Sequence, residues 1–245
     1  MRQTDIIILA AGKGTRMCST LPKVLHKLAS RPLLGHVLNA TSTVDNAQTI
    51  VVTGHGAELV ESEVSDSGAV CVNQAQQLGT AHAVQFALPH LRDNARALIL
   101  YGDVPLIDPR TIQTMVNTVS GTQMALLTVE LDDPTGYGRI VRDDNDNIEA
   151  IVEQKDATPE QLLITEVNTG VMALSGEHLK AWLSQIDNKN AQGEYYLTDL
   201  IAIARQQGIT ITSIKPLSAT EVQGVNNRQQ LSQLERAHQQ KMAET

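Results

Sequence analysis

The chain has 245 residues, 42% of them hydrophobic and only 2% aromatic, and its formal net charge is −8. This length and hydrophobic content suit one α/β domain, alone or with a small lobe, and argue against wholesale disorder. The acidic balance and the scarcity of aromatic stacking platforms argue against nucleic acid as the main partner.

The two cysteines, Cys18 and Cys71, cannot form a disulfide framework, and no Cys/His cluster has the spacing of zinc ligands. No stretch approaches 18 consecutive apolar residues, and the N-terminus lacks the pattern of a signal peptide. We therefore expect a cytoplasmic protein with no membrane partner.

The first half of the chain alternates short apolar runs with helical patterns. The runs predict strands at Ile6–Ala10, Ile50–Thr53, Val70–Asn73 and Ala97–Tyr101. The helices are expected at Pro32–Ser42, Ala57–Ser65, Thr80–Leu91 and Pro109–Val119, with prolines in two first turns and Asp108 as an N-cap. Apolar strands alternating with helices predict a parallel sheet covered by helices on both faces.

The second half changes character. We expect strands at Met124–Leu131, Val167–Leu174 and Ile209–Ile214, and two strand-like pieces within Gly138–Val152 around a turn at 143–147. The expected helices are Glu177–Ile186, Tyr195–Gln207 before Gly208, and Arg228–Met242. This pattern divides the chain into a domain at 1–227 and a C-terminal helix at 228–245.

The segment Gly12-Lys-Gly-Thr-Arg16 follows the first predicted strand. Glycines there let successive main-chain N–H groups face an anion, and two basic side chains add charge. The segment is not a Walker A loop, because Lys13 precedes the second glycine, and Met17 replaces the third glycine of a dinucleotide fingerprint. Taken alone, it could equally be a plain turn with surface charges.

Charge supports an anion site near this loop. Residues 1–31 hold six basic residues, Lys23 among them, against one acidic residue. Asp103 lies just past the fourth predicted strand, where ligands of open α/β sheets bind and where a carboxylate can hold Mg²⁺ against phosphate. The alternative interpretations are that Lys23 is an ordinary solvated lysine and that Asp103 caps the segment that follows it.

Other polar residues follow the third predicted strand. Gln74 carries a carboxamide that could read a uracil edge, and Gly79-Thr80 opens a helix whose N-terminus could approach a base or phosphate. The alternative interpretations are that Gln74 lies on the surface of a loop and that Thr80 caps the helix. No histidines pair at metal-ligand spacing, and we assign a structural role to His82.

Together these residues resemble a known family, over essentially the whole chain. The sequence is similar to the N-terminal pyrophosphorylase domain of the bacterial bifunctional N-acetylglucosamine-1-phosphate uridylyltransferase/glucosamine-1-phosphate acetyltransferase family. The motifs that carry the resemblance are Leu9-Ala-Ala-Gly-Lys-Gly-Thr-Arg-Met17, Leu21-Pro-Lys-Val-Leu-His26, Gln77-Leu-Gly-Thr80, Tyr101-Gly-Asp-Val-Pro-Leu106, Asp133-Pro-Thr-Gly-Tyr-Gly-Arg-Ile140, Ile151-Val-Glu-Gln-Lys-Asp156, Asn168-Thr-Gly170, Asn190-Ala-Gln-Gly-Glu-Tyr-Tyr-Leu-Thr-Asp199 and Glu221-Val-Gln-Gly-Val-Asn-Asn-Arg228.

The resemblance implies a role for each matching residue. Arg16 and Lys23 would be catalytic and hold the triphosphate, and Asp103 and Asn226 would bind Mg²⁺. The nucleotide would contact Leu9, Ala10, Ala11, Gly12, Lys23, Gln74, Gly79 and Thr80. The sugar would contact Tyr101, Gly102, Gly138, Glu153, Asn168, Thr198 and Asn226.

The resemblance also implies a fold and a reaction. The fold would be the Rossmann-like nucleotidyltransferase sheet, mixed but mostly parallel, with a smaller sugar-binding lobe. UTP and N-acetylglucosamine 1-phosphate would give UDP-N-acetylglucosamine and pyrophosphate, for peptidoglycan and lipopolysaccharide precursors. The alternatives are a glucose-1-phosphate nucleotidyltransferase, a cytidylyltransferase of terpenoid synthesis, and a non-catalytic nucleotide-sugar-binding domain.

Full-length members of this family continue through a helical arm into a left-handed β-helix, which acetylates glucosamine 1-phosphate and forms the trimer. The present chain ends at Thr245. We therefore expect the helix at 228–245 to begin that linker arm, and we expect no β-helix, acetyltransferase activity or trimer contact from this chain.

Overall fold

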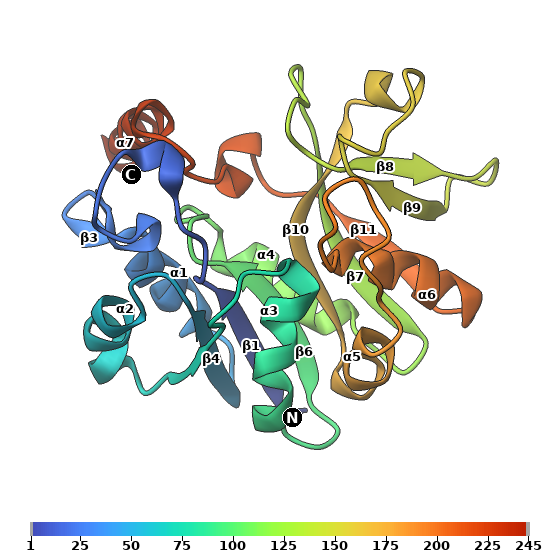
Figure 1. Cartoon of the computed structure of the whole chain (residues 1–245), viewed down its shortest axis with the longest axis horizontal. Helices are drawn as coiled ribbons and strands as arrows, with labels where there is room; N and C mark the ends of the chain where they lie inside the picture. Colours follow the sequence, from blue (N-terminus) through green and yellow to red (C-terminus); the bar gives the residue numbers. More distant parts are fainter. Residues whose placement is uncertain (1, 244–245) are drawn as a thin grey trace.

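A computed structural model describes residues 2–243, and a nine-stranded mixed sheet forms their centre (Figure 1). Seven strands follow the order β11-β7-β10-β6-β1-β4-β5, and β8 and β9 extend from β10. The strands are β1 Thr4–Leu9, β4 Ala47–Thr53, β5 Val70–Asn73, β6 Arg96–Tyr101, β7 Gln123–Glu130, β8 Arg139–Arg142, β9 Ile148–Val152, β10 Glu166–Ser175 and β11 Thr210–Ile214. A separate ribbon pairs β2 Lys27–Leu28 with β3 Arg31–Pro32.

The half of the sheet formed by β6, β1, β4 and β5 is parallel. Strand β1 lies in its middle and is buried along its whole length, which explains the apolar run Ile6–Leu9 in its sequence. Strand β10 runs antiparallel to β6 and β7, while β11 is parallel to β7. The prediction of a mixed, mostly parallel sheet is confirmed.

Helices cover both faces of this sheet. One core joins the sheet to α3 Thr80–Ala87, α5 Gly176–Leu183 and α6 Leu200–Gln206. The other core joins it to α1 Leu33–Thr41, α2 Ala57–Val64 and α4 Pro109–Thr118. As predicted, Asp108 caps α4, because its Oδ1 accepts a hydrogen bond of 2.9 Å from the main-chain N–H of Arg110.

The prediction of a helix over Tyr195–Gln207 is wrong in its first half. The α-helix begins only at Leu200, after a 3₁₀ turn at Leu197–Asp199. The main chain of Tyr195 pairs instead with the segment entering α3: its N–H donates to the carbonyl of Leu78, and its carbonyl accepts from the N–H of Ala81. These tertiary hydrogen bonds replace the helical ones.

The hairpin of β8 and β9 extends the sheet from β10 and forms a smaller lobe beside the other seven strands (Figure 1). The predicted turn at 143–147 is confirmed, because Asp143 accepts hydrogen bonds from the N–H groups of Asn145 and Asn147. On β10, where Arg142 of the hairpin pairs with Glu166, burial opposes ionisation of that carboxyl group. Hydrogen bonds from Arg142, Lys215 and Thr128 outweigh that effect and hold its pKa at about 2.

The C-terminal helix α7, Arg228–Ala243, packs against the N-terminal loop region. Leu234 is buried with Met17 and Leu28. The guanidinium of Arg228 donates to the carbonyl of Met17 at 3.1 Å, and Glu235 accepts from the N–H of Ala29 at 2.9 Å. The division of the chain at 227/228 stays a prediction, and the last two residues of the expected helical segment lie outside the described residues.

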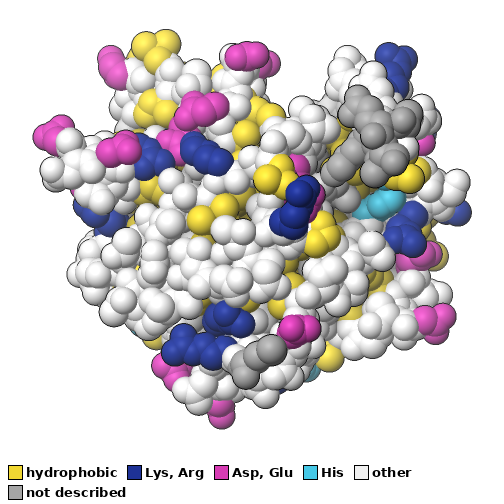
Figure 2. Space-filling view, turned by 180° about the vertical axis from the view of Figure 1, so that it is seen from behind, with side chains coloured by type: hydrophobic (Ala, Val, Ile, Leu, Met, Phe, Trp, Pro, Cys, Tyr) yellow, Lys and Arg dark blue, Asp and Glu magenta, His cyan; other side chains and the backbone are white. Residues whose placement is uncertain are grey.

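The face turned away in Figure 1 carries lysine and arginine side chains interspersed with acidic ones (Figure 2). Between residues 2 and 243, no helix combines the length and the apolar character needed to cross a membrane.

Candidate active site

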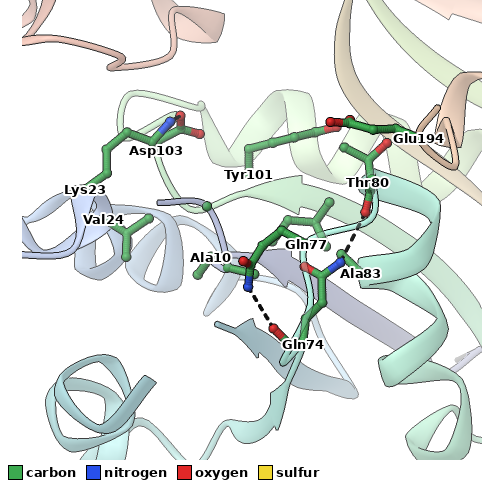
Figure 3. Close-up of a pocket in the computed structure, with 14 residues that line it drawn as sticks. Ala10, Lys23, Val24, Gln74, Gln77, Thr80, Ala83, Tyr101, Asp103 and Glu194 are labelled. Atoms are coloured by element: carbon green, nitrogen blue, oxygen red, sulfur yellow. Dashed lines mark hydrogen bonds and ion pairs between the residues drawn. The ribbon is translucent and has the colours of Figure 1, made fainter. Parts of the chain in front are cut away.

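A cleft of about 270 Å³ opens at the carboxyl end of the parallel strands. It gathers all eight residues predicted to contact a nucleotide, and Tyr101 and Asp103 join them (Figure 3). The eight are Leu9, Ala10, Ala11, Gly12, Lys23, Gln74, Gly79 and Thr80. The cleft thus joins segments separated by about ninety residues in the sequence, from the first loop to the end of β6.

The sheet itself explains this convergence. Leu9, the last residue of β1, lies opposite Val52 of β4 and Tyr101 of β6. The N–H of Gly102 donates to the carbonyl of Leu9 at 2.9 Å, which holds the ends of β1 and β6 together. The carboxyl ends of parallel strands are the usual ligand-binding edge of an open α/β sheet.

The glycine-rich loop lies directly against Lys23. Gly14 has a φ of +58°, and a Cβ there would lie 2.7 Å from the Cβ of Lys23. Any other residue at position 14 would therefore push this lysine away. A Cβ on Gly12 would meet no atom within 4 Å, so space is open beside the loop where it lines the cleft.

Lys23, Asp103, Asn226 and Arg16 form one polar cluster at the end of the cleft. The ammonium group of Lys23 makes an ion pair with Asp103 and lies 3.4 Å from the side-chain oxygen of Asn226. The guanidinium of Arg16 donates to the same oxygen at 3.0 Å. The N–H of Val225 donates to the carbonyl of Asp103 at 2.9 Å, which holds Asn226 beside the end of β6.

The oxygen donors of this cluster suit a hard divalent cation. Asp103 and Asn226 already direct oxygen atoms at a positive charge, the ammonium group of Lys23. Among the described residues, no group of three or more His, Cys, Asp or Glu side chains could hold a metal ion. Mg²⁺ is usually held by one or two protein oxygens, while phosphate oxygens and water complete its coordination.

Tyr101 connects this cluster to the smaller lobe. Its side chain extends from the Asp103 end of the cleft toward Glu194 (Figure 3). Burial raises the pKa of Tyr101, and the carboxylates of Glu153 and Asp103 raise it further. The phenol therefore keeps its proton and can donate a hydrogen bond at neutral pH.

Glu153 directly follows β9 of the smaller lobe and lies against Thr198 of the 3₁₀ turn before α6. The hydroxyl of Thr198 donates to Oε1 of Glu153 at 3.3 Å. Burial raises the pKa of Glu153, although this hydrogen bond opposes the shift. A carboxylate kept in such a setting is a strong acceptor for sugar hydroxyl groups.

The remaining predicted sugar contacts surround Tyr101 and Glu153. A Cβ on Gly138 would lie 3.4 Å from Oε1 of Glu153, and the carbonyl of Gly138 accepts from the N–H of Asn168 at 2.9 Å. Oδ1 of Asn168 accepts from the N–H of Gly170 at 2.9 Å. The Asn168 Nδ2 group makes no hydrogen bond to any residue from 2 to 243, so it is free to donate to a ligand.

Some predicted site residues lie outside the cleft lining, and four lining residues were missed. A Cβ on Gly102 would meet Val24, Leu34 and the carbonyl of Leu9, so the sugar contact of this residue stays a prediction. Arg16 is exposed beside the cleft. The missed residues are Val24, Gln77, Ala83 and Glu194, and all of them except Ala83 lie in motifs that carry the resemblance.

Thr80 links the two halves of the site. Its hydroxyl accepts a hydrogen bond of 3.0 Å from the N–H of Leu197. Gly79, with a φ of +122°, packs so closely on Tyr195 that a Cβ would lie 2.5 Å from the carbonyl oxygen of that residue. The segment before Thr198 is therefore held on the wall that carries the predicted nucleotide contacts.

A family model and several relatives match this chain. The model of the MobA-like NTP transferase domain matches residues 6–169, more than half of the chain. Bifunctional protein GlmU of Cellvibrio japonicus is 56% identical, over 98% of this chain and 53% of that protein. Bifunctional protein GlmU of Pseudomonas aeruginosa is 54% identical, over 98% of this chain and 53% of that protein. The chain spans about half the length of the curated relatives it matches.

Solved structures share the fold at low sequence identity. UDP-glucose pyrophosphorylase in complex with UDP-glucose superimposes with a TM-score of 0.75 at 16% identity, over 98% of this chain and 100% of that chain. A nucleotidyl transferase from Methanothermobacter thermautotroptrophicus has a TM-score of 0.70 at 18% identity, with coverage of 98% and 100%. With its sheet, its loop and its sequence matches in agreement, the chain belongs to the family of MobA-like NTP transferase domains.

Proposed function

We propose that this chain transfers a uridylyl group from UTP to N-acetylglucosamine 1-phosphate, giving UDP-N-acetylglucosamine and pyrophosphate. The chain has the fold of a nucleotidyltransferase, and its relatives at 54–56% identity are bifunctional GlmU proteins. The proposal assigns to this chain one activity of a bifunctional protein.

The observation that carries the proposal is the polar cluster beside the cleft. Lys23 and Arg16 bring two positive charges to one end of a cavity with about the volume that a small ligand needs. The chain as a whole is acidic, with a net charge of −8, so this concentration of positive charge is local. It suits a reaction that must bring two phosphate anions together.

The proposed reaction is an in-line displacement at the α-phosphorus of UTP. An oxygen of the sugar phosphate forms a bond to that phosphorus as the bond to the β-phosphate oxygen breaks, and pyrophosphate leaves with the electron pair. The second pKa of a phosphate monoester is about 6, so the attacking group is already largely dianionic at neutral pH. No general base is needed, and the protein contributes positioning and charge neutralisation.

In this account Lys23 and Arg16 hold the triphosphate and neutralise the charge that develops on the leaving group. Asp103 and Asn226 would hold Mg²⁺, which when bound neutralises charge on the phosphate oxygens. The ion pair between Lys23 and Asp103 would then have to open as substrates and metal enter, because both side chains acquire new partners.

The smaller lobe supports an N-acetylated sugar as the acceptor. Glu153 offers an acceptor for sugar hydroxyl groups, and Nδ2 of Asn168 offers a donor for the acetamido carbonyl. Tyr101 supplies a neutral phenol between them and the polar cluster. An enzyme that acts on glucose 1-phosphate binds no acetamido group, so it would not need the contact from Asn168.

A substrate panel tests the proposal. The purified chain is supplied with Mg²⁺ and UTP or CTP, together with N-acetylglucosamine 1-phosphate or glucose 1-phosphate, and pyrophosphate release is followed. We expect rapid release only with UTP and N-acetylglucosamine 1-phosphate. Preference for glucose 1-phosphate would identify the other sugar branch, and tight binding of UDP-N-acetylglucosamine without turnover would identify a binding domain.

A further inference from the structure

The side chain of Gln74 has a defined orientation at the base of the cleft. It is only 2% exposed, and its Nε2 lies 3.2 Å from the carbonyl oxygen of Gly79. A main-chain carbonyl can only accept a hydrogen bond, so the carboxamide atom that faces it must be the nitrogen. This contact therefore identifies which atom of the Gln74 carboxamide is the nitrogen and which is the oxygen.

The same nitrogen has a second partner, His82. Nδ1 of His82 lies 3.0 Å from Nε2 of Gln74 and must accept its second N–H. Acceptance requires a neutral ring that carries its proton on Nε2. The ring is held edge-on to Phe86, with centroids 5.1 Å apart, and lies 6.3 Å from the ring of Tyr195.

With both N–H groups occupied, the carboxamide oxygen of Gln74 is left for a ligand. In Figure 3 the nitrogen is directed toward the start of α3, and the oxygen lies on the opposite side, toward Gln77. This oxygen accepts no hydrogen bond from the described part of the chain. The cleft therefore presents a hydrogen-bond acceptor, and the contacts of the Gln74 nitrogen with Gly79 and His82 set its direction.

An acceptor that faces N3 of the base would distinguish the two pyrimidine bases. Uracil carries an N–H donor at N3, whereas cytosine carries a lone pair there. If Gln74 turned over to suit cytosine, its oxygen would face the carbonyl of Gly79 and the lone pair of His82, and a buried N–H would lose its partners. Leaving buried polar groups unpaired is the strongest means by which a site rejects an analogue.

We propose that His82 is a positioning residue that sets the choice of uracil over cytosine by holding the Gln74 oxygen toward the base. The inference rests on the proposed function, because it specifies how the nucleotide of that reaction is selected. It also changes the role assigned to His82: the ring is structural in its packing, and its Nδ1 lone pair acts together with the Gly79 carbonyl to hold the Gln74 oxygen toward the base.

A pair of nearly isosteric substitutions tests the inference. His82→Asp and His82→Asn both put an oxygen near the position of Nδ1, but Asp can only accept, whereas Asn can accept or donate. The ratio of kcat/KM for UTP to that for CTP is measured, because both nucleotides carry the same triphosphate and any charge effect cancels. We expect His82→Asn to lower this ratio by roughly tenfold, and His82→Asp to keep it.

A packing control accompanies the pair. Phe86→Leu changes the ring contact of His82 but leaves its bond to Gln74, so the ratio should stay within about twofold of wild type. An unchanged ratio in His82→Asn would overturn the inference, as would an equal fall in both variants, since packing would then be the cause. A wild-type protein without preference for UTP would overturn it as well.

Equilibrium binding separates this inference from the proposed function. Dissociation constants for UTP and CTP, measured by calorimetry without sugar phosphate, should show the same change of ratio. If these ratios change as expected while the wild-type chain forms no UDP-N-acetylglucosamine, the proposed function fails and the role of His82 stands. In the wild-type protein, ¹⁵N NMR should show His82 protonated on Nε2, and protonation on Nδ1 would contradict the inference.

Discussion

Arg16 and Asn226 are 210 residues apart in the sequence, yet a hydrogen bond of 3.0 Å joins the guanidinium of one to the carboxamide oxygen of the other. The same oxygen lies 3.4 Å from the ammonium group of Lys23, which pairs with Asp103. One carboxamide therefore aligns two cations beside the candidate metal ligand. This arrangement is the basis of the first two predictions.

Replacing Arg16 should damage turnover more than folding. The side chain is exposed, so Arg16→Ala should leave the melting temperature nearly unchanged. We expect kcat to fall on the order of 100-fold, because a charge that neutralises the leaving pyrophosphate is lost. Arg236→Ala, an exposed arginine on α7, is the matched control and should turn over normally. Near-normal kcat in Arg16→Ala would remove this residue from the mechanism.

Replacing Asp103 should change the dependence on metal. Asp103→Asn keeps the shape of the side chain but removes the charge that attracts Mg²⁺, so kcat should fall on the order of 100-fold at ordinary Mg²⁺. Raising the Mg²⁺ concentration should restore part of the rate, since weaker binding can be overcome by mass action. The check is a titration of rate against Mg²⁺, and a curve that matches wild type would exclude Asp103 as a ligand.

Much of this site could be predicted because its first half is local in the sequence. The apolar run of β1, the glycine loop after it and the basic residues up to Lys23 are contiguous, so their pattern alone indicated an anion site at a strand end. The position of Asp103 after β6 followed from the same rule for parallel strands. Asn226 had no such local signal, and only the resemblance pointed to it.

The features that could not be predicted depend on contacts across the chain. Tyr195 has a sequence compatible with a helix, but its main chain pairs with the entry to α3. Local propensity cannot anticipate a hydrogen bond to a segment more than a hundred residues away. The lining roles of Gln77 and Glu194 likewise require the folded geometry.

The link between Thr80 and Leu197 should stabilise the fold as well as the site. Thr80→Val keeps the shape of the side chain but leaves the N–H of the buried Leu197 without its acceptor. We expect a loss of about 1–3 kcal/mol in the free energy of unfolding and a raised KM for both substrates. Urea unfolding measures the first effect, with Thr80→Ser as a control that retains the hydroxyl. Equal stability of the two variants would argue against the link.

Asp199 should make the stability depend on pH. Burial, with the nearby carboxylates of Asp187 and Asp156, raises its pKa to about 6, whereas an unfolded chain has about 3.9. The folded state thus binds this proton more tightly, and stability falls as the pH rises from about 4 to about 6. Above that window the ionised carboxylate destabilises the fold.

Asp199→Asn removes that charge. We expect it to raise the free energy of unfolding on the order of 1 kcal/mol at about pH 8, because partial solvation screens some of the shift. The gain should shrink at about pH 5, where wild-type Asp199 is largely protonated. Melting temperatures at the two pH values check this, and a gain that is equal at both would contradict the assignment of the shift to Asp199.

The most direct test of the account is the reaction itself. Purified wild-type chain is incubated with Mg²⁺, UTP and N-acetylglucosamine 1-phosphate, and UDP-N-acetylglucosamine and pyrophosphate are quantified together over time. The account predicts that both products appear in equal amounts, and that the same quantity of Arg16→Ala protein forms them on the order of 100-fold more slowly. Failure of the folded wild-type chain to form either product would contradict it.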